Sequence, residues 1–274
     1  MTARESSMSD SIKSIIGDLV RCCGEPYVAA PEVTELLYTQ LCSYAGQLIR
    51  GLRSQRLSLE NILLAVRNDP LRLARVMDYY RVLDSGYSED DTLGNLEDDE
   101  ETYLSMIMLK RNSLKRLMDV SAQLKIQIAD DDCELLPKHY APFVEGRRLR
   151  LERIDRKISQ LSVDEYLKFS KMRQSASLLT LAKPSTRLAF WRWISEQCPD
   201  VDTPVNQPVK FPSSLSEELR VLVHVLTGDL LHVIDLTLYY RQKLGIELSS
   251  PLTPVELKQA AHMKSVKFAA SKVP

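Results

Sequence analysis

The chain has 274 residues, of which 44% are hydrophobic and 27% charged, a composition typical of a folded protein with one large or two small domains. Its net charge of −1 argues against a protein whose main task is to neutralise nucleic-acid phosphates, because such proteins are strongly basic. The longest uninterrupted apolar run is about five residues, far short of the roughly 20 that a membrane helix needs, so no membrane span is expected.

The cysteines and the start of the chain indicate the compartment. Five cysteines are present, an odd number, and no two have the C-x-x-C spacing. This pattern predicts reduced thiols in a cytosolic or nuclear protein. Residues 1–10 are polar and contain no apolar core, so no secretory signal is expected.

A first group of three helices is predicted within residues 9–67. Ser9 begins a run of good N-cap residues for a short helix. Pro31 then begins a helix of about 24 residues, or about 36 Å, which is roughly twice the usual length. Its apolar side chains recur every three or four positions and include Leu37, Leu41, Tyr44 and Leu48. This apolar face needs an equally long partner. After the helix, Leu57 is predicted to form a short bridging strand, Ser58 to cap a third helix and Pro70 to begin a further one.

Charge is segregated in the middle of the chain. Residues 84–101 contain nine acidic residues and no basic one, which predicts an exposed linker, with a docking segment for a basic partner as the alternative. A helical pattern follows within residues 103–128. Residues 147–157 form a basic helical stretch, for which pairing with the acidic tract and nucleic-acid binding are both open. Ser162 and Glu165 form a capping box that opens another helix.

A second group of three helices is predicted within residues 185–266. In the first, short helix Trp191 is expected to face the core, and Trp193, two residues on, to be partly exposed as at an interface. A capping box at Ser214 begins a second unusually long helix, of about 29 residues. Its apolar stripe includes Leu222, Leu226, Leu230 and Val233. A similar start signal at Thr253 opens the last helix.

No catalytic constellation is recognised in the sequence. It has no glycine-rich phosphate loop, no G-x-S-x-G elbow and no H-E-x-x-H motif. His224 and His232 are about two helical turns apart, with Asp229 and Asp235 nearby, but a metal site would need ligands that the sequence does not supply. No metal, cofactor or small-molecule substrate is therefore expected, and an enzyme is the least supported function.

The two groups of helices share one layout: a short helix, a very long helix and a short helix. This is the layout of a histone fold, and two such units in one chain can pack together without a second polypeptide. We therefore predict an all-α protein, an intramolecular head-to-tail pair of histone folds. The expected divisions are an N-terminal histone fold with an extra helix in 1–82, an acidic linker in 83–102, a helical middle region in 103–183 and a C-terminal histone fold in 184–274. The core is expected to join Leu37, Leu41, Tyr44, Leu48 and Trp191 with Leu222, Leu226, Leu230 and Val233.

Four segments follow one another along the chain. The first is the arginine loop and capped helix in residues 53–69, and the second is the aromatic pair Tyr166 and Phe169 with Arg173 and Gln174 after it. The third is the aromatic pair Phe190 and Trp191, and the fourth is residues 234–242. In order and spacing they resemble the suppressor-of-Ty three family, the SAGA coactivator subunit with two histone folds in one chain. The family usually carries a glutamate in the middle of its second long helix, where this chain has Gly228. Asp229 is adjacent, but one residue on a helix turns a side chain by about 100°.

The resemblance implies a non-enzymatic, nuclear coactivator subunit that binds the TATA-box-binding protein and helps deliver it to promoters. Other histone-fold subunits of a SAGA-type complex are the further implied partners, and DNA contact is possible but weak. The candidate protein-interaction residues are Arg53, Arg56, Tyr166, Phe169, Arg173, Gln174, Trp193, Asp229 and Asp235. Arg53 and Arg56 lie where histones touch DNA phosphates, although surface solvation or ion pairing is the favoured explanation for two arginines.

Two other functions remain open beside this one. A DNA-contacting doublet histone predicts duplex binding that weakens strongly with salt, and the net charge of −1 speaks against it. A structural helical adaptor without a histone fold predicts that the two end segments, made separately, neither fold nor bind each other.

Overall fold

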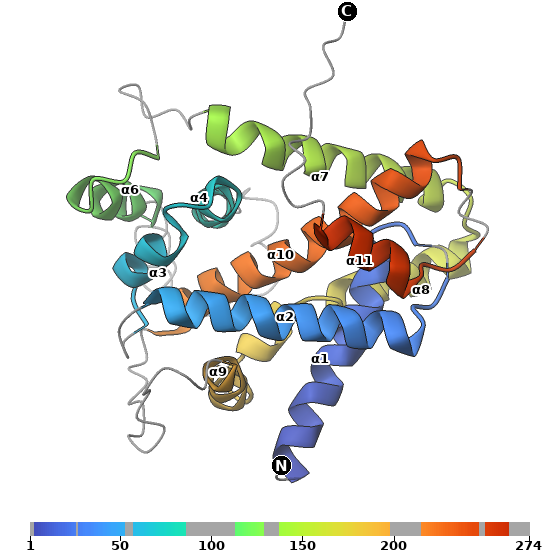
Figure 1. Cartoon of the computed structure of the whole chain (residues 1–274), viewed down its shortest axis with the longest axis horizontal. Helices are drawn as coiled ribbons and strands as arrows, with labels where there is room; N and C mark the ends of the chain where they lie inside the picture. The colour runs from blue at the N-terminus through green and yellow to red at the C-terminus, as the bar shows by residue number, and fades with distance from the viewer. Residues whose placement is uncertain are drawn as a thin grey trace, which may run out of the picture. The chain divides into compact units, whose positions relative to one another are not determined.

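The computed structural model describes residues 3–25, 27–52, 57–85, 113–128, 137–197, 215–246 and 250–262, and within them the regular structure is helical, with no strand (Figure 1). The prediction of an all-α protein is confirmed at this level. Leu57, predicted to form a bridging strand, is instead a buried residue of irregular backbone. Arg53, Arg56, Ser214 and most of the acidic tract lie outside the described residues.

The chain divides into two compact units. Unit 1 contains Met1–Arg50 and Val144–Pro274, and unit 2 contains Gly51–Phe143. The N-terminal segment and the C-terminal helices therefore share one unit. The expected divisions at residues 82, 102 and 183 do not coincide with these limits.

Unit 1 begins with two helices of similar length. Helix α1 (Ala3–Cys22) has 20 residues and α2 (Pro31–Leu52) has 22. The prediction that a short helix starts at Ser9 is wrong, because Ser9 lies inside α1, where its hydroxyl is 2.9 Å from the Tyr38 hydroxyl on α2. Helix α2 buries Leu37, Leu41, Tyr44 and Leu48, and all four are at most 3% exposed.

The C-terminal part of unit 1 has the short–long–short layout. Helices α9 (Arg187–Glu196), α10 (Leu215–Lys243) and α11 (Pro254–His262) have 10, 29 and 9 residues. Helix α10 packs on α11 and on the short 3₁₀ helix η2 (Leu178–Ala182). Its apolar stripe is fully buried at Leu222, Leu226, Leu230 and Val233. The start of α11 is fixed as expected, because the Thr253 hydroxyl accepts a hydrogen bond from the Glu256 N–H and the Glu256 carboxylate accepts one from the Thr253 N–H.

Length and mean hydropathy alone would allow one described helix, Glu217–Lys243 within α10, to cross a membrane. The sequence prediction of no membrane span, based on the short uninterrupted apolar runs, did not single out this helix. The same properties are typical of the core helix of a folded domain, and 67% of the most apolar window is buried within the protein.

A close approach of backbones joins α2 to the end of α9. A Cβ atom placed on Gly46 would lie 2.6 Å from the Gln197 carbonyl oxygen, a distance that no side chain tolerates. Glycine at this position therefore lets α2 pass directly against Gln197, the residue that caps the C-terminus of α9.

Unit 2 contains three described helices, α3 (Leu59–Val66), α4 (Pro70–Ser85) and α6 (Ser113–Gln123), and both α3 and α4 pack on α6. As predicted, Ser58 caps α3: its hydroxyl accepts a hydrogen bond from the Asn61 N–H at 3.3 Å. Pro70 begins α4, and the Asp69 carboxylate accepts hydrogen bonds from the next free N–H groups. The remaining helices, α7 (Pro137–Ile158) and α8 (Val163–Ser175), lead back into unit 1, with residues 137–143 of α7 in unit 2.

Candidate protein-interaction site

Helix α8 is anchored at both its start and one of its faces. The predicted capping box is present: the Ser162 hydroxyl accepts from the Glu165 N–H at 3.4 Å, and the Glu165 carboxylate accepts from the Ser162 N–H at 2.9 Å. Hydrogen bonds from the side chain and then the backbone of Ser162 hold the pKa of Glu165 below its ordinary value. Packing of α8 on α1 completes its attachment to unit 1.

The two sides of α8 differ in exposure. Phe169 is buried, and the Lys157 ammonium of α7 lies 5.2 Å from the centre of its ring, which is a cation–π distance. On the other side Val163, Tyr166 and Leu167 are 76%, 45% and 52% exposed. A helix that is attached by one apolar side and leaves a second one open has a face available for another protein.

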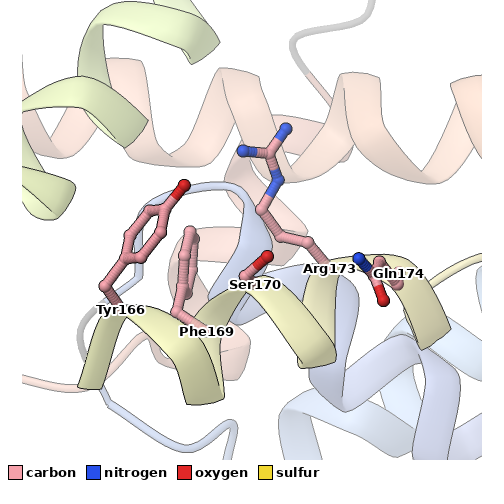
Figure 2. A pocket seen from close by; sticks show the side chains of 5 residues that line it. All are labelled: Tyr166, Phe169, Ser170, Arg173 and Gln174. Atoms are coloured by element: carbon pink, nitrogen blue, oxygen red, sulfur yellow. The ribbon is translucent and has the colours of Figure 1, made fainter. Parts of the chain in front are cut away.

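A cavity of about 250 Å³ lies on this helix, lined by Tyr166, Phe169, Ser170, Arg173 and Gln174 (Figure 2). Figure 2 shows the two aromatic rings standing next to each other, with the Arg173 guanidinium extending away from the α8 backbone on the same side. Four of the five lining residues were candidate interaction residues. Ser170 was missed, although its position four residues after Tyr166 places it on the same helical face.

Asp235 has a different environment from that expected of an interaction residue. It lies in α10, is buried, and accepts hydrogen bonds from Arg150 of α7 at 2.6 and 2.9 Å and from Arg153. Arg153 also donates to the Cys23 carbonyl at 3.2 Å. Asp235 is thus enclosed in ion pairs of its own chain, because two arginines of the basic stretch, Arg150 and Arg153, turn inward to it.

A second buried ion pair joins the N-terminal segment to the end of α10. The Arg241 guanidinium donates to the Glu25 carboxylate at 3.2 Å, and both side chains are 1% exposed. Arg241 also lies 3.3 Å from the Glu256 carboxylate of α11. Burial raises the pKa of Glu25 above its ordinary value even though Arg241 opposes the shift.

The described cysteines fit the expectation of reduced thiols. Cys22, Cys23 and Cys42 are free. Burial raises the pKa of Cys23 to about 12 and that of Cys22 to about 11, so neither is a reactive thiolate near neutral pH.

Trp193 is buried and not partly exposed as expected. It is 6% exposed, its indole N–H donates to the Tyr38 hydroxyl at 3.0 Å, and its ring stacks on Phe190 at 5.8 Å. Trp191, two residues earlier, is buried too. Helix α9 is covered on more than one side, by η2 and by α1 and α2, so two residues on different faces can both be enclosed.

A scan against protein-family models finds no match for this chain. Searches of curated proteins and of solved structures likewise find no match. Function is therefore inferred from the residues of the chain itself.

Three candidate interaction residues remain. Asp229 is half-buried on α10, and Arg53 and Arg56 lie outside the described residues. Across the described ranges no group of three His, Cys, Asp or Glu side chains could hold a metal ion. What the geometry offers is a face for recognition: an exposed apolar patch, a small cavity and an arginine on α8.

Proposed function

We propose that this chain is a non-enzymatic, nuclear coactivator subunit of the suppressor-of-Ty three type, which binds the TATA-box-binding protein and helps deliver it to promoters. Its two histone folds pair within one molecule, and it assembles with other histone-fold subunits of a SAGA-type complex. The face of α8 is its recognition surface.

The observation that carries this proposal is the gathering of Tyr166, Phe169, Arg173 and Gln174 around one cavity. These residues form the mid-chain motif of the resemblance, and three of them are exposed to solvent while Phe169 forms the buried floor. An exposed aromatic and an exposed arginine are the side chains that most often dominate binding at protein interfaces.

The pairing of the two histone folds has its own support. The long helices α2 and α10 belong to one compact unit, and the stripes that the proposal places face to face are buried. The buried ion pair between Glu25 and Arg241 ties residues 216 positions apart in the sequence. The second group of helices has the short–long–short lengths of a histone fold, whereas in the first group α1 is nearly as long as α2.

The DNA-binding alternative has less support than the sequence suggested. Two arginines of the basic stretch, Arg150 and Arg153, are engaged with Asp235, and Lys157 donates to the carbonyls of Arg21 and Glu25. These cations are thus used inside unit 1 rather than presented to phosphates.

The test is retention of purified TATA-box-binding protein on the immobilised full chain, beside an unrelated basic protein as control. We expect selective retention that falls at least about tenfold in Arg173→Glu, because charge reversal at the centre of an interface is costly. Arg192→Glu, an exposed charge reversal on α9, should retain the wild-type level. Equal retention of both proteins would reduce the binding to charge attraction and contradict the proposal.

A further inference from the structure

One exposed face of α8 carries a continuous row of six side chains. At 100° per residue, Val163, Tyr166, Leu167, Ser170, Arg173 and Gln174 fall within a sector of about 120°, and the buried Phe169 lies next to its Arg173 edge. We call this row the α8 stripe. Its spacing of three and four residues is the spacing with which one helix packs against another.

The α8 stripe changes character along its length. Its N-terminal half is apolar, formed by the exposed side chains of Val163, Tyr166 and Leu167. Its C-terminal half is polar and cationic, with Ser170 and Gln174 in the middle, Arg173 on one flank and Lys171 near the other. A complementary segment must therefore combine apolar residues with acidic ones.

Arg173 has no ion-pair partner among the described residues. It is exposed, and within that part of the chain its guanidinium makes no hydrogen bond either. The exposed Arg148 of α7, by contrast, is already paired with Glu145 and Glu152. An open arginine beside a cavity is the arrangement that receives a carboxylate in a bidentate hydrogen bond.

The size of the cavity favours a side chain over a small-molecule ligand. Its volume is about 250 Å³, below the roughly 300–1,000 Å³ of typical ligand pockets. Tyr166, Phe169 and Arg173 are among the side chains that line it (Figure 2). One partner side chain with an apolar stem and a carboxylate end would contact all three.

We propose that the α8 stripe binds an acidic amphipathic helix of a partner protein, running antiparallel to α8. The first turns of that helix place carboxylates at Arg173 and Lys171, and its later turns place apolar residues on Val163, Tyr166 and Leu167. The inference rests on the proposed function in one respect: it takes the α8 face to be a recognition surface.

The charges of α8 itself set the direction. Asp164 and Glu165 are exposed in its first turn, so an acidic segment is repelled there and attracted at the other end. Antiparallel packing then puts the acidic residues in the first turns of the partner, where the dipole of the partner helix also favours negative charge.

A second copy of this chain fits the stripe less well. Antiparallel pairing of two α8 helices would match acidic with basic ends, but it would set the apolar half of each stripe against Ser170 and Gln174 of the other copy. The apolar side chains would then gain little burial.

The test uses fluorescence anisotropy with the full chain and two labelled synthetic peptides of identical composition. The forward peptide has glutamates in its first two turns and leucine and phenylalanine at i, i+3, i+4 and i+7 spacing after them, and the second peptide has the reverse order. We expect the forward peptide to bind at least about tenfold more tightly than the reversed one. Arg173→Glu and Leu167→Asp should each weaken it by at least about tenfold, and the milder Arg173→Gln by less. Arg192→Glu should leave binding within about twofold.

Three results would overturn the inference: equal binding of both peptides, an equal loss in Arg192→Glu, or a concentration-dependent dimer that the peptide displaces and Leu167→Asp abolishes. Circular dichroism of each variant verifies that the fold is kept, as expected for exposed positions. If the peptide does not bind while Arg173→Glu still loses the TATA-box-binding protein, only this inference fails. If the peptide binds and that protein is not retained, the proposed function fails instead.

Discussion

The motif on α8 and the segment at the end of α10 have opposite roles in the fold. The motif on α8 leaves Tyr166 and Arg173 exposed, whereas the motif at the end of α10 buries Asp235 and Arg241. Both contain a charged residue at a position that sequence alone marks as suitable for a partner. The role of a charged residue therefore depends on whether the fold supplies a counter-ion. Asp235 and Arg241 form ion pairs with residues of their own chain, and Arg173 forms none within the described residues.

The largest expected difference between the two segments is in stability. Asp235→Asn leaves Arg150 and Arg153 without the carboxylate that they share, so the free energy of unfolding should fall by about 3–5 kcal/mol. Urea denaturation followed by circular dichroism measures this. A loss smaller than about 0.5 kcal/mol would mean that Asp235 contributes no more to stability than an ordinary surface residue.

A smaller effect is expected at the start of α8. Ser162→Ala removes the hydroxyl that caps the helix and should lower the free energy of unfolding by about 1 kcal/mol. Ser175→Ala, at the other end of α8, is a matched control because, among the described residues, its hydroxyl bonds to carbonyls of the preceding turn and caps no N–H group. If both variants have the same stability, the cap does not define where α8 begins.

The smallest effect on stability belongs to the exposed motif. Arg173→Glu should change the free energy of unfolding by less than about 0.5 kcal/mol, since no described residue pairs with Arg173. The same urea experiment serves as the measurement. A loss as large as that of Asp235→Asn would remove the contrast between the two segments and would make Arg173 a structural residue.

Local signals predicted the starts of five described helices correctly, those of α2, α3, α4, α8 and α11. Ser58, Ser162 and Thr253 cap helices, and Pro31 and Pro70 begin them, because each signal acts on the first turn alone. The length of α10 also agreed, since its apolar periodicity continues to its end. The predicted helix start at Ser9 was wrong because α1 begins before it. A residue with a good capping side chain can also lie inside a helix.

Burial at long range could not be predicted. Trp193 is enclosed through Tyr38, 155 residues away, and Asp235 through Arg150, 85 residues away. A helical period shows which residues share a face, but it does not show how many faces the fold covers. For the same reason the sequence marked Asp235 and Arg173 alike, and only their neighbours distinguish them.

In the proposed pairing of the two histone folds, the long apolar stripes of α2 and α10 pack against each other within one molecule. A double-mutant cycle with Leu41→Ala and Leu226→Ala tests it directly, by urea denaturation of the two single variants and the double variant. Each single change should cost about 2–5 kcal/mol, because both side chains are fully buried. We predict a coupling energy of at least about 0.5 kcal/mol between them, and strictly additive losses would contradict the pairing of the two histone folds.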